Sequence, residues 1–327
     1  MKDGFQRNID YLRISLTDRC NLRCRYCMPE EGIEKKEHAD MLSLEQIARV
    51  VRIASETAGI SKIRLTGGEP LVRKGIHDLI HQISRLPGIE EVSLTTNGIL
   101  FASQAEKLKA AGLKRVNFSM DTLREDRFLY ITRGGKLQQV KDAVERAIAL
   151  EFLPVKINVV AMQGFNDDEI LDFADWAYRE PLHIRFIECM PVGNLPFYSA
   201  DKVLPLQMIR QKIESRYALL PVQQKSGAGP AECFSLAGGS GLIGFIGAMT
   251  HHFCDHCNRL RLTADGRLRP CLYSQQEINI KNALDSDAAD AVIAQFLQEA
   301  VQMKPAEHQM EQGWGEKNTR KMYQIGG

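Results

Sequence analysis

The chain has 327 residues, of which 44% are hydrophobic and 25% are charged, and its formal net charge is +1. These values are ordinary for a globular protein, and the near-zero charge excludes a general attraction to nucleic acid or to an acidic membrane. No apolar run approaches the ~20 residues that a membrane span needs. Residues 1–10 also lack the apolar core of a signal peptide. We therefore expect a cytoplasmic protein that binds neither membranes nor nucleic acid.

Short apolar segments alternate with longer amphipathic ones along the first two thirds of the chain. The segments that resemble strands are YLRISL (11–16), KIRLT (62–66), EVSLTT (91–96), RVNFSM (115–120), VKINVVAM (155–162) and HIRFIE (183–188). Between the first two, Ser43 with Gln46 predicts a capping box, and Gly59 predicts the end of the same helix. Asn166 with Glu169 predicts the start of another helix, which ends near residue 179.

This alternation predicts the fold class. Six strand–helix units imply parallel strands joined by right-handed crossovers, but a complete barrel needs eight. The alternation ends near residue 220, where QQKSGAGPAE (223–232) is typical of a loop or a boundary. We predict an α/β protein with a partial (βα)6 TIM-like barrel over residues 1–220. A C-terminal region, residues 221–327, is expected to close the open side of the barrel.

Six of the eight cysteines form two triplets, Cys20/Cys24/Cys27 and Cys254/Cys257/Cys271. In a cytoplasmic protein such groups indicate metal ligation or redox chemistry rather than disulfides. The first triplet follows the first predicted strand, at the end of a barrel where active sites lie. Three cysteines can hold three irons of a [4Fe–4S] cluster and leave the fourth iron open for an outside ligand. A structural zinc site completed by a distant residue such as His38 is the alternative.

The second triplet has the spacing C-x2-C-x13-C, which by itself suits zinc and iron–sulfur equally well. Zinc could take its fourth ligand from His251, His252 or His256. Arg259 and Arg261 follow the CxxC, and on an extended segment residues two apart face the same way. Two guanidiniums beside a cluster would bind an anion such as a phosphate. A solvent-exposed basic edge strand is the other interpretation.

Together these motifs resemble a known superfamily. CNLRCRYC (20–27) fits the C-x3-C-x-aromatic-C signature of radical S-adenosylmethionine (SAM) enzymes, and TGGEP (66–70) follows the next strand, as that superfamily's glycine-rich element does. From LRISLTDRCNLRCRYCMP through LTTNG, FIECMPVGN and CNRLRLTADGRLRPCL to the final IGG, the chain is similar to the GTP 3′,8-cyclase family of molybdenum cofactor biosynthesis. The resemblance implies a lyase whose cofactors are SAM and two [4Fe–4S] clusters.

The resemblance also implies a reaction and partners. A 5′-deoxyadenosyl radical would abstract the 3′ hydrogen of GTP. Carbon C3′ would then attack C8 of the guanine and give (8S)-3′,8-cyclo-7,8-dihydroguanosine 5′-triphosphate. The implied electron donor is a reduced flavodoxin or a similar protein, and a cyclic pyranopterin monophosphate synthase would act downstream. A homodimer is compatible with the family.

Site residues can be carried over from the family one position at a time. The resemblance implies that one cluster is held by Cys20, Cys24 and Cys27 and the other by Cys254, Cys257 and Cys271. The implied SAM contacts are Tyr26, Gly68, Ser119 and Met190. The implied GTP contacts are Arg13, Arg64, Thr95, Lys156, Arg259 and Arg261. The implied catalytic residues are Arg259, Arg261, Gly326 and Gly327, the two glycines as a tail that reaches the active site. Without the family, such a terminus would be interpreted as a frayed end.

Other interpretations stay open at this point. A radical SAM enzyme that modifies peptides would also carry an auxiliary cluster, although usually with more cysteines. A non-catalytic zinc and iron–sulfur protein that binds nucleotides belongs to another class. GSGLIG (239–244) fits a dinucleotide fingerprint with Asp265 about 20 residues further on, but no helical pattern follows it. Cys189 would be an inert core thiol or an oxidation-sensitive one, and Cys233 carries no signal.

Overall fold

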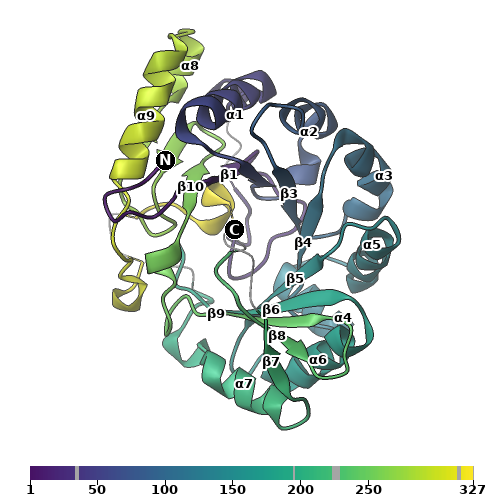
Figure 1. The fold of residues 1–327 in the computed structure, drawn as a ribbon. Coiled ribbons are helices and arrows are strands. Elements are labelled where there is room, and N and C mark those ends of the chain that lie inside the picture. The colour runs from purple at the N-terminus through teal and green to yellow at the C-terminus, as the bar shows by residue number, and fades with distance from the viewer. Residues whose placement is uncertain (34–36, 194–195, 223–228, 315–317, 327) are drawn as a thin grey trace.

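The computed structural model describes residues 1–33, 37–193, 196–222, 229–314 and 318–326. A curved sheet lies at its centre with helices around the outside (Figure 1). The six predicted strands are confirmed, and each pairs in parallel with the next. They are β1 (Tyr11–Ser15), β2 (Lys62–Thr66), β3 (Glu91–Thr96), β4 (Arg115–Ser119), β5 (Val155–Ala161) and β6 (Leu182–Glu188). The partial barrel expected from the sequence is therefore present.

The helices cover the outer face of the sheet. They are α1 (Leu44–Ala58), α2 (Ile76–Ile83), α3 (Phe101–Ala111), α4 (Glu125–Thr132), α5 (Leu137–Ala149) and α6 (Ile170–Arg179). Along β1, Leu12 and Ile14 belong to the main hydrophobic core. Because side chains alternate along a strand, Tyr11 and Arg13 point to the other face, into the barrel. The same alternation on the other strands gives the barrel a polar interior.

The predicted helix signals are confirmed at one helix and only partly at another. Ser43 and Gln46 form the expected capping box of α1, and Gly59 ends that helix in the left-handed conformation at φ 66°. Asn166 and Glu169, in contrast, do not cap α6. The Asn166 amide binds the backbone of Asp121 and Val160, and a 3-10 turn, Asp167–Glu169, precedes the helix. Both side chains form tertiary hydrogen bonds instead of capping the helix.

The part of the chain that follows β6 adds strands to both edges of the parallel sheet. These strands are β7 (Leu219–Pro221), β8 (Glu232–Leu236), β9 (Leu242–Ile246), β10 (Arg259–Leu262), β11 (Arg267–Arg269) and β12 (Ile278–Asn279). β9 pairs in parallel with β6, and β10 pairs in parallel with β1, so the region narrows the open side from both ends. Its helices are α7 (Leu206–Glu214), α8 (Lys281–Asp285), α9 (Asp290–Gln302) and α10 (Met322–Ile325).

Two further expectations concern these segments. The last four residues of GSGLIG run into strand β9 rather than into a helix, so the dinucleotide fingerprint does not form its βα turn. The boundary near residue 220 stays a prediction, and β7 lies at that position. Among the described residues, no helix is long and apolar enough to cross a membrane. The end of the described chain, marked C, lies inside the ring of strands (Figure 1).

Candidate active site

The first cysteine triplet lies on the loop that follows β1. The backbone N–H groups of Cys27 and Met28 both donate to the carbonyl of Cys24, which folds the loop into a tight turn. Burial raises the pKa of the Cys20 thiol to about 11 and that of the Cys27 thiol to about 12. After burial, the charges of the other two sulfurs are the largest causes that raise the pKa of Cys24. Three sulfurs that oppose one another's ionisation in this way lie close together on the loop, and a positively charged metal cluster would let all three ionise. The donor set fits a [4Fe–4S] cluster.

The glycine-rich loop after β2 packs directly against the cysteine loop. A Cβ atom on Gly68 would lie 2.3 Å from the carbonyl oxygen of Arg19, so no larger residue fits there. The Gly68 N–H also donates to the carbonyl of Thr17 at 2.7 Å. The atoms that approach Gly68 this closely are therefore backbone atoms of the chain itself. The expected SAM contact of Gly68 stays a prediction.

Two acidic residues that sequence reasoning missed hold this end of the barrel together. Buried Glu69 accepts hydrogen bonds from Leu71 and Asn97 N–H and from Thr96 Oγ1, which ties the loops after β2 and β3 together. Asp121, after β4, accepts the hydroxyl of Tyr26 at 2.7 Å. Burial raises the pKa of Glu69 to about 7 and that of Asp121 to about 6. Asp121 directly follows a predicted strand, and Glu69 comes three residues after one. Their position at the ends of these strands could have indicated both from the sequence.

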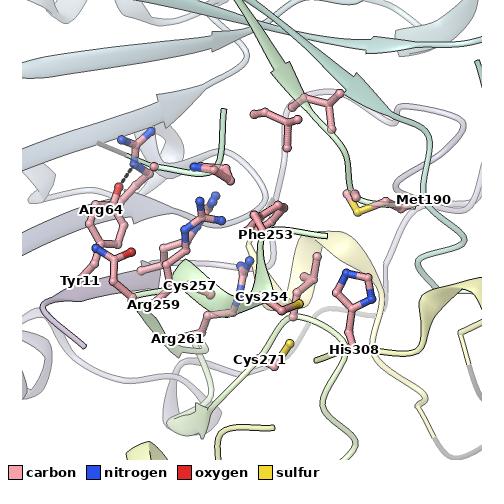
Figure 2. A pocket seen from close by; sticks show the side chains of 18 of the residues that line it. Tyr11, Arg64, Met190, Phe253, Cys254, Cys257, Arg259, Arg261, Cys271 and His308 are labelled. Carbon is pink, nitrogen blue, oxygen red and sulfur yellow. Dashed lines mark hydrogen bonds between the residues drawn. The ribbon is translucent and has the colours of Figure 1, made fainter. Parts of the chain in front are cut away.

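The second triplet lies at the opposite end of the barrel. Cys254 and Cys257 precede β10, whereas the first triplet follows β1, and these two strands run in parallel. The antiparallel β10–β11 pair, with Arg261 opposite Arg269, returns the chain so that Cys271 comes back beside the CxxC. Figure 2 shows Cys254, Cys257 and Cys271 around one space. The two triplets therefore lie at opposite ends of the parallel strands.

The zinc alternative finds little support in this arrangement. Among the described residues, no group of three His, Cys, Asp or Glu side chains is placed to hold a single metal ion. In a [4Fe–4S] cluster each cysteine binds a different iron, so the three sulfurs need not converge on one ion. The His256 side chain is 86% exposed beside Asp255. The side chain of His38 lies outside the described part of the chain.

A cavity inside the barrel, bordered by the second triplet, is lined by positive charge. Arg261, Arg13 and Arg64 are register partners on the adjacent strands β10, β1 and β2, so their guanidiniums form a row. The complete set of cationic residues on its wall is Arg13, Arg64, Arg115, Arg185, Arg259, Arg261 and Lys304. No carboxylate is among the described residues that line it. Like charges directly opposite one another in a sheet are unfavourable, so the cavity is suited to an anion of several charges.

Most predicted substrate residues meet in this cavity. Thr95 lines it together with the arginines. So do Met190, a predicted SAM contact, and all three cysteines of the second triplet (Figure 2). Lys156 is not part of the lining but is buried, and its register partner Asn117 lines the cavity. Burial, and then the neighbouring arginines, lower the pKa of Lys156 to about 6. Ser119 ends β4 beside Asn158, next to the loops that carry the first triplet.

Two arginines that line the cavity were missed from the sequence. Arg115 begins β4 and pairs with Glu91, and Arg185 lies on β6 opposite Gly244. Burial, with the arginines around it, lowers the pKa of Arg185 to about 10, and its buried Nε has no hydrogen-bond partner among the residues that the structure describes. The signal for both was their position on the inward-facing alternation of predicted strands.

The C-terminal tail lies between the two triplets. Arg261 Nη1 donates to the carbonyl oxygen of Gly326 at 2.9 Å, and Met322 lines the cavity. The backbone of Tyr323 is hydrogen-bonded to Cys27 of the first triplet. A Cβ atom on Gly326 would lie 2.6 Å from Thr66 Cγ2 at the end of β2. The tail therefore contacts Arg261 beside the second triplet and Cys27 of the first. The catalytic role of Gly326 stays a prediction, and Gly327 lies outside the described residues.

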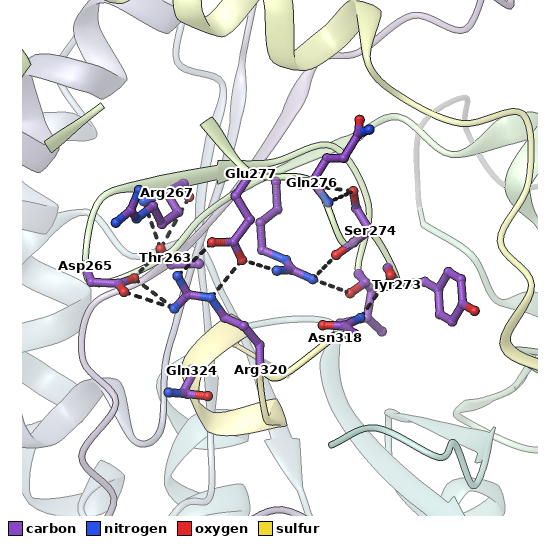
Figure 3. A network of polar contacts seen from close by, with 12 residues as sticks. Thr263, Asp265, Arg267, Tyr273, Ser274, Gln276, Glu277, Asn318, Arg320 and Gln324 are labelled. Atoms are coloured by element: carbon purple, nitrogen blue, oxygen red, sulfur yellow. Dashed lines mark hydrogen bonds and ion pairs between the residues drawn. The ribbon is translucent and has the colours of Figure 1, made fainter. Parts of the chain in front are cut away.

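A polar network holds the base of this tail. Arg320 donates Nη1 to both carboxylate oxygens of Asp265 at 3.0 Å each. It also donates Nε and Nη2 to the two oxygens of Glu277, at 2.7 and 2.8 Å (Figure 3). Arg269 binds Glu277 from the other side. The tail is thus fixed to the β10–β12 hairpins just before it enters the site.

The two single cysteines lie away from the triplets. Cys189 is buried against Met162 and Ile131, and burial raises the pKa of its thiol to about 11, which agrees with the core interpretation. Cys233 is also buried, and its Sγ lies 3.2 Å from Nε2 of His183.

Sequence comparisons identify the class of enzyme that this fold and site define. A sequence model of the radical SAM superfamily matches residues 14–177, and one described as Molybdenum Cofactor Synthesis C matches residues 182–310. The chain is a radical SAM enzyme, and its cofactors are SAM and [4Fe–4S] clusters. Proteins named GTP 3′,8-cyclase from Syntrophomonas wolfei and Moorella thermoacetica are 56% and 54% identical over 327 residues, covering 100% of both chains. The chain belongs to the GTP 3′,8-cyclase family.

Solved structures show the same fold at low sequence identity. Streptococcus suis SuiB bound to S-adenosylmethionine has a TM-score of 0.56 and 16% identity, covering 88% of this chain and 67% of that one. Native anSMEcpe with bound AdoMet has a TM-score of 0.56 and 16% identity, with coverages of 83% and 78%. These likenesses concern the fold alone. The full-length relatives favour the GTP cyclase interpretation over the peptide-modifying and non-catalytic ones.

Proposed function

We propose that GTP binds in the cavity bordered by the second triplet and is cyclised there, the activity for which the relatives are named. The row formed by Arg261, Arg13 and Arg64 is the observation that carries this proposal. These cations lie on three adjacent strands inside a barrel, where their repulsion is costly unless a polyanion neutralises it. A triphosphate supplies that charge, and guanidiniums bind phosphate oxygens with two hydrogen bonds each.

The second triplet would bind a cluster at one end of the substrate. Cys254, Cys257 and Cys271 supply three ligands, so the fourth iron could accept a donor atom of the guanine. Arg259 and Arg261 lie on β10, the strand that follows Cys257. The base and the phosphates would therefore be held by one structural unit, this triplet with its adjoining strand. Such fixed positioning can remove several kcal/mol from a barrier, about 7–11 in favourable intramolecular cases.

The first triplet would hold the cluster that binds SAM. Tyr26, held by Asp121, and the loop of Gly68 and Glu69 flank this cluster, and Ser119 and Met190 would complete the SAM site. When bound, SAM and a reduced cluster supply a primary carbon radical that takes a hydrogen atom from a substrate carbon. The tail with Gly326 fills the space between the two sites, which would exclude water from that radical.

The remaining partners belong to the same proposal. The reaction needs one electron at a time, so we propose a reduced flavodoxin or a similar donor. The product would pass to a cyclic pyranopterin monophosphate synthase. A homodimer and a cytoplasmic location are also part of the proposal and require separate measurement.

The test uses the anaerobically reconstituted chain with SAM, a strong reductant and GTP deuterated at C3′. Deuterium should appear in the 5′-deoxyadenosine while GTP is consumed. SAM cleavage without deuterium transfer would retain the superfamily but reject hydrogen abstraction from C3′ of GTP. No cleavage by protein with a verified [4Fe–4S] content would reject the catalytic role of the first triplet.

A further inference from the structure

Lys304 is a buried lysine beside the second triplet that the resemblance does not explain. It lies just beyond the end of α9, and only 3% of it is exposed. Its ammonium donates to the carbonyl oxygens of Arg259 at 2.8 Å and Pro270 at 2.9 Å, and to Cys257 Sγ at 3.4 Å. An ammonium has three N–H donors, so all of them are used. One side chain thus joins the CxxC, the start of β10 and the residue before Cys271.

The positive charge of Lys304 needs a negative partner. A buried ammonium is costly unless a charge pairs with it, and two carbonyl dipoles replace only part of its hydration. Within the described part of the chain, no carboxylate is at ion-pair distance from Lys304. The sulfur of Cys257 is the one contact of the ammonium that becomes an anion when the cysteine ligates iron. The pairing is therefore complete only with the cluster in place.

We propose that Lys304 is a positioning residue for the second cluster and sets its reduction potential. This inference rests on the proposed function, which places a [4Fe–4S] cluster on Cys254, Cys257 and Cys271. Hydrogen bonds to the sulfurs and the local net charge are the protein's means of tuning such clusters. An added positive charge favours the reduced, more negative state and therefore raises the potential. It also withdraws electron density from the open iron, which makes that iron a better acceptor for a guanine donor atom.

Arg7 provides a matched control because it supports the same loop without touching a sulfur. Its guanidinium donates to the carbonyl oxygens of Cys254 at 2.6 Å and Ala306 at 2.9 Å. It also donates to Asp3 and to the carbonyl of Pro305, next to Lys304. Replacing Arg7 therefore disturbs the shape of the loop, whereas replacing Lys304 also removes the hydrogen bond and the charge at Cys257.

The experiment uses the full chain with the first triplet replaced by alanine, so that only the second cluster is measured. Lys304→Met, Lys304→Arg and Arg7→Met are compared by iron, sulfide and zinc content and by an EPR-monitored redox titration. At the parent's midpoint potential, Lys304→Met should lower the ratio of reduced to oxidised cluster about tenfold, which is about 59 mV for one electron. Lys304→Arg should show a smaller shift, and Arg7→Met should show none.

Each outcome decides between the possibilities. Loss of iron from Lys304→Met alone would also support the role, because the other two variants would show that the loop still folds. An unchanged midpoint at full iron content would overturn it. So would an equal shift, or an equal loss of iron, in Lys304→Met and Arg7→Met, because the effect would then come from loop shape. Zinc instead of iron in the unmutated second triplet would reject the proposed cluster itself, independently of Lys304.

Discussion

The guanidinium of Arg261 donates to the carbonyl oxygen of Gly326 across the interior of the barrel. Arg261 lies on β10 with the second triplet, and Gly326 lies in the tail against the end of β2. One hydrogen bond therefore connects the wall that is proposed to bind GTP with the segment that closes the SAM side. An anion that binds Arg261 would compete with the hydrogen bond from Arg261 to the tail or reorient it. Binding at one end of the cavity would in this way change the position of the tail at the other end.

Replacing Arg259 or Arg261 with alanine should weaken GTP binding and leave SAM cleavage possible. A hydrogen bond to a charged group contributes about 1.5–3 kcal/mol, so affinity should fall about 10- to 100-fold. Anaerobic calorimetry with GTP measures this loss. Arg267→Ala is the control, because Arg267 lies on the same hairpin but outside the cavity, and it should bind GTP normally. Intact affinity in the Arg261 variant would show that the substrate site has been misplaced.

Adding one methyl group to the tail should disturb it. A Cβ on Gly326 would lie 2.6 Å from Thr66 Cγ2, at a φ of 84° that side chains rarely adopt. We expect Gly326→Ala to displace the tail and to lower cyclisation about 100-fold, since a shift of about 1 Å can have that effect. Removing Gly326 and Gly327 should abolish cyclisation, with the iron content unchanged in both cases.

Gly313→Ala distinguishes the effect of the steric contact with Thr66 from the effect of backbone strain at a positive φ. Gly313 also has a positive φ, 95°, but a Cβ there would meet no atom within 4 Å. Its variant should therefore cyclise GTP at close to the normal rate. Full product formation by the chain without its last two residues, measured by liquid chromatography, would rule out a role for the tail.

Local sequence pattern predicted the strands and the cysteine loops because both depend on residues close together in the chain. The opposite placement of the triplets could not be obtained in this way. It follows from the parallel pairing of Tyr11 with Arg259, two residues about three quarters of the chain apart. Periodicity along the chain carries no information on a pairing of that range.

The missed residues fall into two kinds. Glu69 and Asp121 lie just after predicted strands, so their position at the active end of the barrel could have indicated them. Lys304 and Arg320 lie in polar segments without periodicity, and only their partners show what they do. Each is bound to groups more than thirty residues away in the sequence. Contacts of that range are determined by tertiary packing.

Replacing Arg320 with methionine should release the tail at its base. The change removes four hydrogen bonds to Asp265 and Glu277 and leaves two partly buried carboxylates without that partner. We expect faster hydrogen exchange in residues 318–326 and at least tenfold slower cyclisation, because a looser tail would position the site less well. Arg216→Met, which removes an exposed ion pair with Asp175, is the control. Unchanged exchange in the tail would show that other contacts hold it.

Lys156 should make GTP binding depend on pH. Its pKa of about 6 leaves the free protein mostly neutral at this position at pH 7–8. A bound triphosphate favours the ammonium and raises that pKa, so binding takes up a proton in this range. Affinity should then fall as pH rises above 6, by up to about tenfold per unit, until the pKa of the complex is passed.

Calorimetry in buffers of different ionisation enthalpy measures this proton uptake directly. Lys156→Arg is the matched variant, because a guanidinium stays charged throughout and should bind GTP without taking up a proton. The terminal phosphate of GTP also titrates near pH 6, so the difference between the two proteins is the informative quantity. Equal proton uptake by both would show that Lys156 is charged in the free protein or lies too far from the phosphates to sense them. Lys156 is only 3% exposed, so a charged ammonium is the less favourable state of this side chain in the free protein.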